Sequence, residues 1–360
     1  MSYFNSENDF FTLPLLKPKA MYKSFFRPLL FTFPPESAHN IIFSLLKFTH
    51  RIPFFSVLLR TFFIPKNNEY PIELFGLKFK HPIGLAAGLD KNAELIDPLS
   101  NFGFSFIEIG AVTPLPQKGN PKPRLFRLKQ DNALINRMGF NNKGLKNAVK
   151  NLKKRKSDII VGANIGKNTK TPNDKANDDY IKCFNELHDY VDYFTVNVSC
   201  PNIKDLKELQ DKDALLDLLT RLKEINTKKR KPKPILLKIS PDLTWSQLDD
   251  TLNIIKQTKI DGIVAVNTTV SRNNLSLPAD EIQKIGNGGL SGKPLKDRAT
   301  EIIRYIHKKT DAKLPIIGVG GIMNKQDMQE KLDAGADLVQ VFTGFVYEGP
   351  GMVKRFLDNG

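Results

Sequence analysis

From Ile72 onward, short apolar segments alternate with stretches of helical periodicity. Ile72–Phe75 and Leu77–Phe79 flank Gly76 and predict a small β-hairpin. Eight further apolar segments predict buried strands over Ile83–Ala87, Phe106–Gly110, Ile159–Ile165, Tyr193–Asn197, Ile235–Ile239, Gly262–Val266, Ile316–Val319 and Leu338–Val341. Helical patterns lie between and after them, over Leu215–Ile225, Leu248–Ile255, Ile302–Ile306 and Met328–Leu332. This alternation predicts an α/β fold of the (β/α)8 type, a TIM barrel, over residues 72–360. A doubly wound sheet is the alternative, but its strand, glycine-rich loop and helix opening is absent.

Residues 21–64 differ in composition, since they hold ten of the 25 phenylalanines. A first helical face is formed by Tyr22, Phe25, Phe26, Leu29, Leu30 and Phe33, and a second by Ala38, Ile41, Ile42, Leu45 and Leu46. Pro34 and Pro35 separate the two helices, and Glu36 or Ser37 opens the second. Neither approaches the ~20 apolar residues that span a bilayer. Their aromatic and basic residues favour a helical pair in the membrane interface, with an ordinary docked pair as the alternative. Residues 1–20 carry no targeting pattern and are expected to be a poorly ordered leader.

The composition limits the kinds of binding partner and the redox compartment that we expect. The chain has 54 basic and 38 acidic residues, a net charge of +16, which suits nucleic acid, an anionic membrane surface or acidic metabolites, or reflects only a lysine-rich surface. Cys183 and Cys200 are the two cysteines, so a reducing compartment is expected, and Cys183 falls within a helical pattern as a core residue. The five histidines have no ligand spacing, so we expect no metal.

Polar side chains follow several of the predicted strands. Lys91 follows the first, Asn164 lies in the third, Lys238 in the fifth, and Asn267 and Thr268 follow the sixth. Because all strand carboxyl ends meet at one mouth of a barrel, these groups are expected to surround a ligand. The fourth strand leads into Asn197-Val198-Ser199-Cys200-Pro201-Asn202. We interpret Cys200 as a catalytic base and the two flanking asparagines as substrate ligands.

Glycine-rich loops follow the last strands. Gly318-Val319-Gly320-Gly321 and Thr343-Gly344 occupy the positions where barrels commonly bind phosphate, and Gly288 to Gly292 adds a third such loop. The implied ligand is a phosphorylated cofactor across the barrel mouth, with Lys238 as a fixed positive charge facing its ring.

Five motifs together resemble dihydroorotate dehydrogenases. They are Ala86-Ala87-Gly88-Leu89-Asp90-Lys91, Asn136-Arg137-Met138-Gly139-Phe140-Asn141, Asn197 to Asn202, Gly289-Leu290-Ser291-Gly292 and Ile317-Gly318-Val319-Gly320-Gly321-Ile322. The similarity runs from about Met21 to Gly360. The amino-terminal helices resemble those of the quinone-dependent, membrane-associated class 2 enzymes, which the soluble class 1 enzymes lack.

The resemblance implies a site and an activity. Flavin mononucleotide (FMN) would contact Ala87, Gly88, Ala111, Asn164, Asn197, Lys238 and Val266, and its phosphate Gly292, Gly321, Phe342 and Thr343. Dihydroorotate or orotate would contact Lys91, Asn136, Arg137, Met138, Gly139, Phe140, Asn197, Asn202, Asn267 and Thr268. His39 and Arg127 match positions beside the quinone tunnel. Cys200 would remove a proton while hydride leaves for FMN, Lys238 would stabilise charge on the reduced flavin, and a membrane quinone would accept the electrons, in pyrimidine (UMP) biosynthesis.

Three positions differ from the usual class 2 pattern. Cys200 stands where serine is normal, and cysteine there is the class 1 pattern; Ala111 and Phe342 replace residues that often carry hydroxyls. A soluble, fumarate-dependent enzyme is therefore one alternative, and a flavoenzyme like the tRNA dihydrouridine synthases is another. We expect a monomer that binds no nucleic acid, held peripherally at the cytoplasmic face of a bacterial cell membrane.

Overall fold

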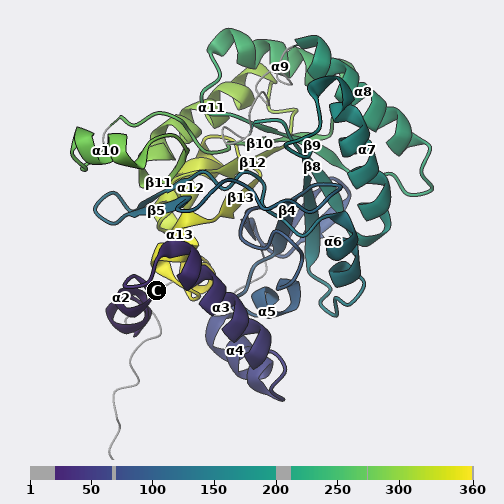
Figure 1. Cartoon of the computed structure of the whole chain (residues 1–360). Helices are drawn as coiled ribbons and strands as arrows, with labels where there is room; N and C mark the ends of the chain where they lie inside the picture. The colour runs from purple at the N-terminus through teal and green to yellow at the C-terminus, as the bar shows by residue number, and fades with distance from the viewer. Residues whose placement is uncertain (1–20, 67–69, 200–211, 274, 359–360) are drawn as a thin grey trace, which may run out of the picture.

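Eight parallel strands close into a barrel. The computed structural model describes residues 21–66, 70–199, 212–273 and 275–358. The barrel strands, each paired with the next and the last with the first, are β3 (Ile83–Leu85), β4 (Phe106–Val112), β7 (Ile160–Ile165), β8 (Tyr193–Asn197), β9 (Ile235–Ile239), β10 (Gly262–Ala265), β12 (Ile316–Val319) and β13 (Leu338–Val341) (Figure 1). All eight predicted strands are confirmed, and so is the TIM-barrel fold.

The amino-terminal end of the barrel is closed by the predicted hairpin. Strands β1 (Ile72–Leu74) and β2 (Leu77–Phe79) pair antiparallel across Phe75 and Gly76, which both have positive φ. Phe79 packs edge to face on Phe106 with ring centroids 5.3 Å apart. Phe106 belongs to an apolar layer inside the barrel with Tyr193, Leu236, Val264, Ile317 and Leu338. The opposite end of the barrel, at the carboxyl ends of the strands, is not closed by a hairpin and can hold a binding site.

Helices cover the outside of the barrel. They are α5 (Ile96–Ser100), α6 (Leu145–Leu152), α7 (Ala176–Leu187), α8 (Lys212–Thr227), α9 (Trp245–Thr258), α10 (Ala279–Ile285), α11 (Lys296–Lys309), α12 (Lys325–Asp333), α13 (Thr343–Glu348) and α14 (Met352–Leu357). The four predicted helices are confirmed within α8, α9, α11 and α12. Thr244 begins α9 through a capping box with Gln247, which satisfies the first backbone donors of the helix. Cys183 is buried on the inner face of α7, as predicted.

A small antiparallel sheet was not predicted. It consists of β5 (Leu125–Leu128), β6 (Ala133–Asn136) and β11 (Gly289–Gly292) in the order β11-β6-β5. These strands have four residues each, and β11 contains two glycines and a serine, so no period of two is visible in the sequence. Leu128, Ala133, Ile135 and Leu290 of this sheet pack in a cluster separate from the main core. The sheet lies beside the barrel mouth, because Leu134, Asn136 and Ser291 line the pocket there.

The amino-terminal residues form more helical segments than the two expected. The structure contains η1 (Tyr22–Phe26), α2 (Arg27–Leu30), α3 (Pro35–Thr49) and α4 (Phe55–Phe63), and α3 and α4 project together from the barrel (Figure 1). The predicted break at Pro34 is confirmed, and Pro35 begins α3. Helix α4 was not predicted: its nine residues are mostly apolar, with Ser56, Arg60 and Thr61 as the polar ones. No helix in the described part of the chain is long and apolar enough to cross a membrane.

Polar contacts attach these helices to the barrel domain. The Tyr22 hydroxyl donates to the Val346 carbonyl at 2.7 Å, and Lys23 pairs with Glu348 at 2.6 Å. The other face of the helices is apolar and exposed, and it includes Phe25, Leu29, Ile41, Leu45, Phe48, Phe54, Val57 and Leu58.

Candidate active site

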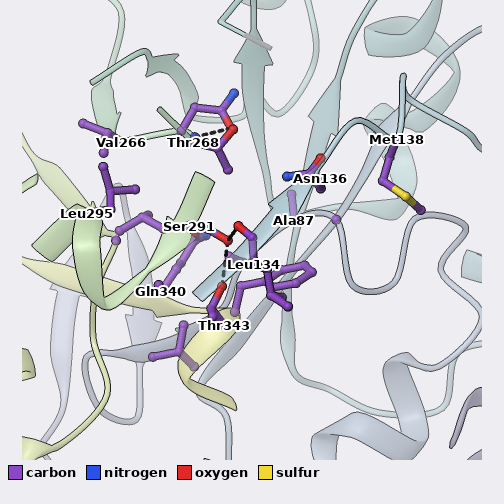
Figure 2. Close-up of a pocket in the computed structure, with 18 of the residues that line it drawn as sticks. Ala87, Leu134, Asn136, Met138, Val266, Thr268, Ser291, Leu295, Gln340 and Thr343 are labelled. Atoms are coloured by element: carbon purple, nitrogen blue, oxygen red, sulfur yellow. Dashed lines mark hydrogen bonds between the residues drawn. The ribbon is translucent and has the colours of Figure 1, made fainter. Parts of the chain in front are cut away.

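One pocket lies at the carboxyl ends of the barrel strands, with a cavity volume of about 200 Å³. Side chains from the barrel and from the small sheet line it (Figure 2), and α3 contributes Glu36 and His39. It brings together most of the predicted site residues: His39, Ala87, Gly88, Lys91, Ala111, Asn136, Met138, Gly139, Phe140, Asn164, Asn197, Lys238, Val266, Asn267, Thr268, Gly292, Gly321, Phe342 and Thr343. Residues more than 300 positions apart in the sequence therefore meet around one cavity.

Three asparagine amides form a connected row in this pocket. Asn197 Nδ2 donates to Asn164 Oδ1 at 3.0 Å, and Asn267 Nδ2 lies 3.4 Å from Asn197 Oδ1. Asn197 and Lys238 are direct register partners on β8 and β9, so the lysine and the amides share one part of the pocket. Buried amides and a buried ammonium group at a strand end suit a polar, planar ligand.

A buried polar layer below the pocket was missed by the sequence analysis. Glu108 is fully buried on β4 and accepts hydrogen bonds from Asn164, Tyr193, Thr195 and Gln340. Burial and the neighbouring Glu108 carboxylate raise the pKa of the Tyr193 hydroxyl well above its usual value, so this hydroxyl stays protonated as a donor. The available signal was a lone carboxylate inside the apolar run Phe106–Val112.

The loop after β3 holds Lys91 at the pocket. The buried carboxylate of Asp90 accepts from the backbone N–H groups of Glu94 at 2.8 Å and Leu95 at 2.7 Å. Burial raises the pKa of Asp90 to about 6 despite these hydrogen bonds. Lys91 Nζ donates to Asn141 Oδ1 at 2.6 Å, which orients its charge across the pocket.

The glycine loops form a cradle without side chains. Gly292 and Gly321 have φ of +100° and +75°, and a Cβ at either would overlap backbone atoms of Asn132 or Lys296. The Ser291 and Thr343 hydroxyls lie 2.8 Å apart between these loops (Figure 2). The backbone N–H groups of these loops and the two hydroxyls are the donor types that bind a cofactor phosphate.

At the opposite side of the pocket, α3 contributes His39 and Glu36. Burial, with a smaller effect of the Lys91 charge, lowers the pKa of His39 to about 4, so its ring is neutral at pH 7. Glu36 was not predicted. Its carboxylate pairs with Arg124, Oε1 lying 2.6 Å from Nη2 and Oε2 3.2 Å from Nε.

Among the predicted residues that the structure describes, Arg137 and Arg127 do not line this pocket. The Arg137 guanidinium donates to the carbonyls of Pro123 and Ile285 and lies over the Phe126 ring. Arg127 donates to the carbonyls of Leu30 and Phe33 and lies over the Phe31 ring, so it fastens the amino-terminal helices to β5. Cys200 and Asn202 lie outside the described residues, and the expected leader over residues 1–20 does as well.

The fold and the site together define a class of protein. It is a (β/α)8 barrel whose one described mouth pocket combines glycine loops, lysines and amides, an arrangement typical of enzymes that bind polar ligands. Membership of a particular family follows from comparison with known proteins.

The chain belongs to the dihydroorotate dehydrogenase family, because that family's model matches residues 71–359. It is 54% identical over 94% of its length to the whole of a protein from Christiangramia forsetii named dihydroorotate dehydrogenase (quinone). A Coxiella burnetii protein of the same name is 46% identical over 94% of this chain and 96% of its own. The crystal structure of the Eimeria tenella enzyme in complex with ferulenol matches with a TM-score of 0.80 at 34% identity, covering 89% of each chain. The family resemblance drawn from the motifs is confirmed.

Proposed function

We propose that this chain oxidises dihydroorotate to orotate with FMN as hydride acceptor and a membrane quinone as the final electron acceptor. The chain is a quinone-dependent dihydroorotate dehydrogenase of pyrimidine biosynthesis, by its identity to relatives of that name along almost its full length. The observation that carries the proposal is the shared pocket in which Lys91, Lys238 and the asparagine amides meet the glycine cradle.

FMN fits the residues present. The family is flavin-dependent. The positions proposed for the phosphate are Gly292, Gly321, Phe342 and Thr343, where side chains are absent or hydroxylated except at Phe342. Ala87, Gly88, Ala111 and Val266 offer an apolar surface for the ring system, as Figure 2 shows for Ala87 and Val266. Bound FMN would supply hydride acceptance.

The substrate is held by complementary charge and hydrogen bonding. Lys91 supplies a cation for the carboxylate of dihydroorotate, and such charge-assisted hydrogen bonds are the stronger ones. Asn136, Asn197 and Asn267 present both amide donors and carbonyl acceptors, which match a ring of alternating N–H and C=O groups. Met138, Gly139 and Phe140 line the same pocket, and Thr268 fixes the Asn267 amide by donating its backbone N–H at 2.9 Å.

Cys200 is proposed as the base that removes a proton from the ring carbon next to the one that loses hydride. A thiol has a reference pKa of ~8.5, far below that of a serine hydroxyl, so less activation is required. Lys238, nearly fully buried at the end of β9, places a fixed positive charge where negative charge develops.

Quinone is proposed to enter between the amino-terminal helices, past His39. A neutral His39 presents little charge to an apolar quinone. The exposed apolar residues of α3 and α4, together with the basic surface, suit peripheral binding to an anionic membrane at the cytoplasmic face of a bacterial cell.

The half-reaction tests this chemistry. Purified protein mixed anaerobically with dihydroorotate should lose its yellow absorption and release one orotate per flavin. Cys200→Ala should keep its FMN yet bleach orders of magnitude more slowly, because the substrate proton has no acceptor. Colourless protein, or bleaching at the wild-type rate in Cys200→Ala, would overturn the flavin or the base respectively.

A further inference from the structure

The Glu108 carboxylate inside the barrel receives hydrogen bonds on both of its oxygens. Oε1 accepts from Asn164 Nδ2 at 2.9 Å. Oε2 accepts from Thr195 Oγ1 at 3.0 Å, Tyr193 Oη at 3.2 Å and Gln340 Nε2 at 2.8 Å. A carboxylate can only accept, so each amide that faces Glu108 must turn its NH2 group toward it.

This constraint is passed along the row of amides into the pocket. Asn164 points its NH2 at Glu108, so its oxygen is left to accept from Asn197 Nδ2 at 3.0 Å. The Asn197 oxygen is in turn left for the Ser199 backbone N–H at 3.3 Å and for Asn267 Nδ2 at 3.4 Å.

The far end of the row is fixed independently. The backbone N–H of Thr268 donates to Asn267 Oδ1 at 2.9 Å, and a backbone N–H can only donate. Four hydrogen bonds therefore run in one direction, from the Thr268 N–H through Asn267, Asn197 and Asn164 to Glu108. The two ends agree, so each amide has one orientation.

Gln340 is oriented by the same carboxylate. Its Nε2 donates to Glu108, and its Oε1 is buried with no hydrogen-bond partner within the described chain. Gln340 also lines the pocket (Figure 2). A buried unpaired acceptor is costly, which indicates that a ligand donor meets it.

We propose that Glu108 is a positioning residue that sets which amides in the pocket donate and which accept. The ligands concerned rest on the proposed function, namely orotate at Asn197 and Asn267 and the flavin beside Gln340. Glu108 acts through these amides and is not among the residues that line the pocket.

Glu108→Gln tests the proposal because it preserves shape but cannot accept on both sides. If the new NH2 group faces Asn164, then Asn164 and Asn197 must both turn over. The Asn197 NH2 group would then face the NH2 group of Asn267, which cannot turn because its oxygen accepts from the Thr268 N–H. If it faces the other side, Gln340 must reverse and present a donor to the pocket. Either arrangement leaves mismatched buried groups, so we expect the dissociation constant of orotate or of FMN to rise about tenfold or more.

Two further variants separate this role from packing. Thr195→Val removes one hydrogen bond to Glu108 Oε2 with little change in shape and leaves the Asn164 side intact. Glu108→Asp is a worse fit in volume but keeps an acceptor on both sides. We expect both variants to bind orotate and FMN within about threefold of the wild type, since amide orientation is retained. A packing role predicts the reverse order, with Glu108→Gln milder than Glu108→Asp.

The measurements are the visible spectrum, FMN retention and the orotate dissociation constant from flavin difference spectra, with melting temperature as a stability control. Both constants within threefold of wild type in Glu108→Gln, or an equal loss in Thr195→Val, would overturn the proposal. Should Glu108→Gln yield no folded protein, a tenfold loss in Glu108→Asp would contradict it and near wild-type binding would support it. Failure of the wild type to bind FMN or orotate would instead refute the proposed function.

Discussion

The Glu36–Arg124 pair is expected to hold α3 against the barrel, and Glu36→Gln weakens it with minimal change in shape. Arg124 is buried and also donates to the carbonyls of Lys118 at 2.6 Å and Asn120 at 3.0 Å, so its position does not depend on Glu36. Partial burial alone would raise the pKa of Glu36, but the hydrogen bond and charge of Arg124, with smaller contributions from Lys122, outweigh burial and lower the pKa. The pair therefore contributes net stabilisation to the docked helix.

The size of the effect follows from what a glutamine side chain can still offer Arg124. Glutamine keeps one acceptor for the guanidinium, but it lacks the negative charge and cannot accept the second hydrogen bond. Hydrogen bonds to charged groups contribute about 1.5–3 kcal/mol, so undocking of α3 should become about tenfold to a hundredfold more frequent. Lys122→Ala is the matched control, because Lys122 lies 3.5 Å from the same carboxylate but is largely exposed, and exposed pairs contribute at most ~1 kcal/mol.

Native-state trypsin digestion measures this undocking. When opening and closing are fast, the rate of cleavage within residues 21–64 follows the population of the open form. Turnover with quinone should fall in Glu36→Gln, while turnover with a soluble dye acceptor should be retained. Cleavage at the wild-type rate, or equal acceleration in Lys122→Ala, would refute this account of the helix attachment.

Three other predictions concern the substrate, the cofactor and pH. Lys91→Met should raise the KM for dihydroorotate about tenfold to a hundredfold by removing a charge-assisted hydrogen bond, with FMN content unchanged in the flavin spectrum. Thr343→Val should weaken FMN binding about tenfold, measured by reconstitution of apoprotein, because the phosphate loses a hydroxyl donor. Burial lowers the pKa of His81 to about 4, and its Nδ1 accepts the Ile83 N–H, so protonation opposes folding. The pKa of His81 in the unfolded chain is ~6.5, so its contribution of about 3 kcal/mol to the free energy of unfolding is complete above that pH and is lost as the pH falls toward 4. In urea unfolding, the free energy of unfolding of His81→Asn should therefore fall less than that of the wild type between pH 7 and pH 4.

The barrel could be predicted because its strands are buried on both faces. Each reads as a short continuous apolar run, and the predicted bounds of Tyr193–Asn197 and Ile235–Ile239 are those that the structure shows. The sheet of β5, β6 and β11 could not be predicted, because four-residue strands rich in small residues carry no periodic signal. Helix α4 was missed because a nine-residue segment in which six residues are Phe, Val or Leu is too short for its periodicity to be told from that of a buried strand.

The pocket lining could be predicted largely because strand carboxyl ends converge in this fold. Asn164, Asn197, Lys238 and Asn267 needed only the strand order to be placed together. Glu108 and Gln340 were missed because a single polar residue in a buried strand does not show in the sequence which partners it meets. Arg137 belongs to a motif that lines the pocket, yet its side chain turns away to the backbone carbonyls of Pro123 and Ile285.

The most direct test of the central claim is steady-state oxidation of dihydroorotate by the purified, detergent-solubilised full chain, with ubiquinone and fumarate compared as acceptors. Orotate should form with ubiquinone in equal amount to the quinol, and fumarate should support no turnover above the acceptor-free control. Turnover with fumarate but not with ubiquinone would contradict the quinone assignment. Cys200, and not the amino-terminal helices, would then be the feature that predicts the electron acceptor.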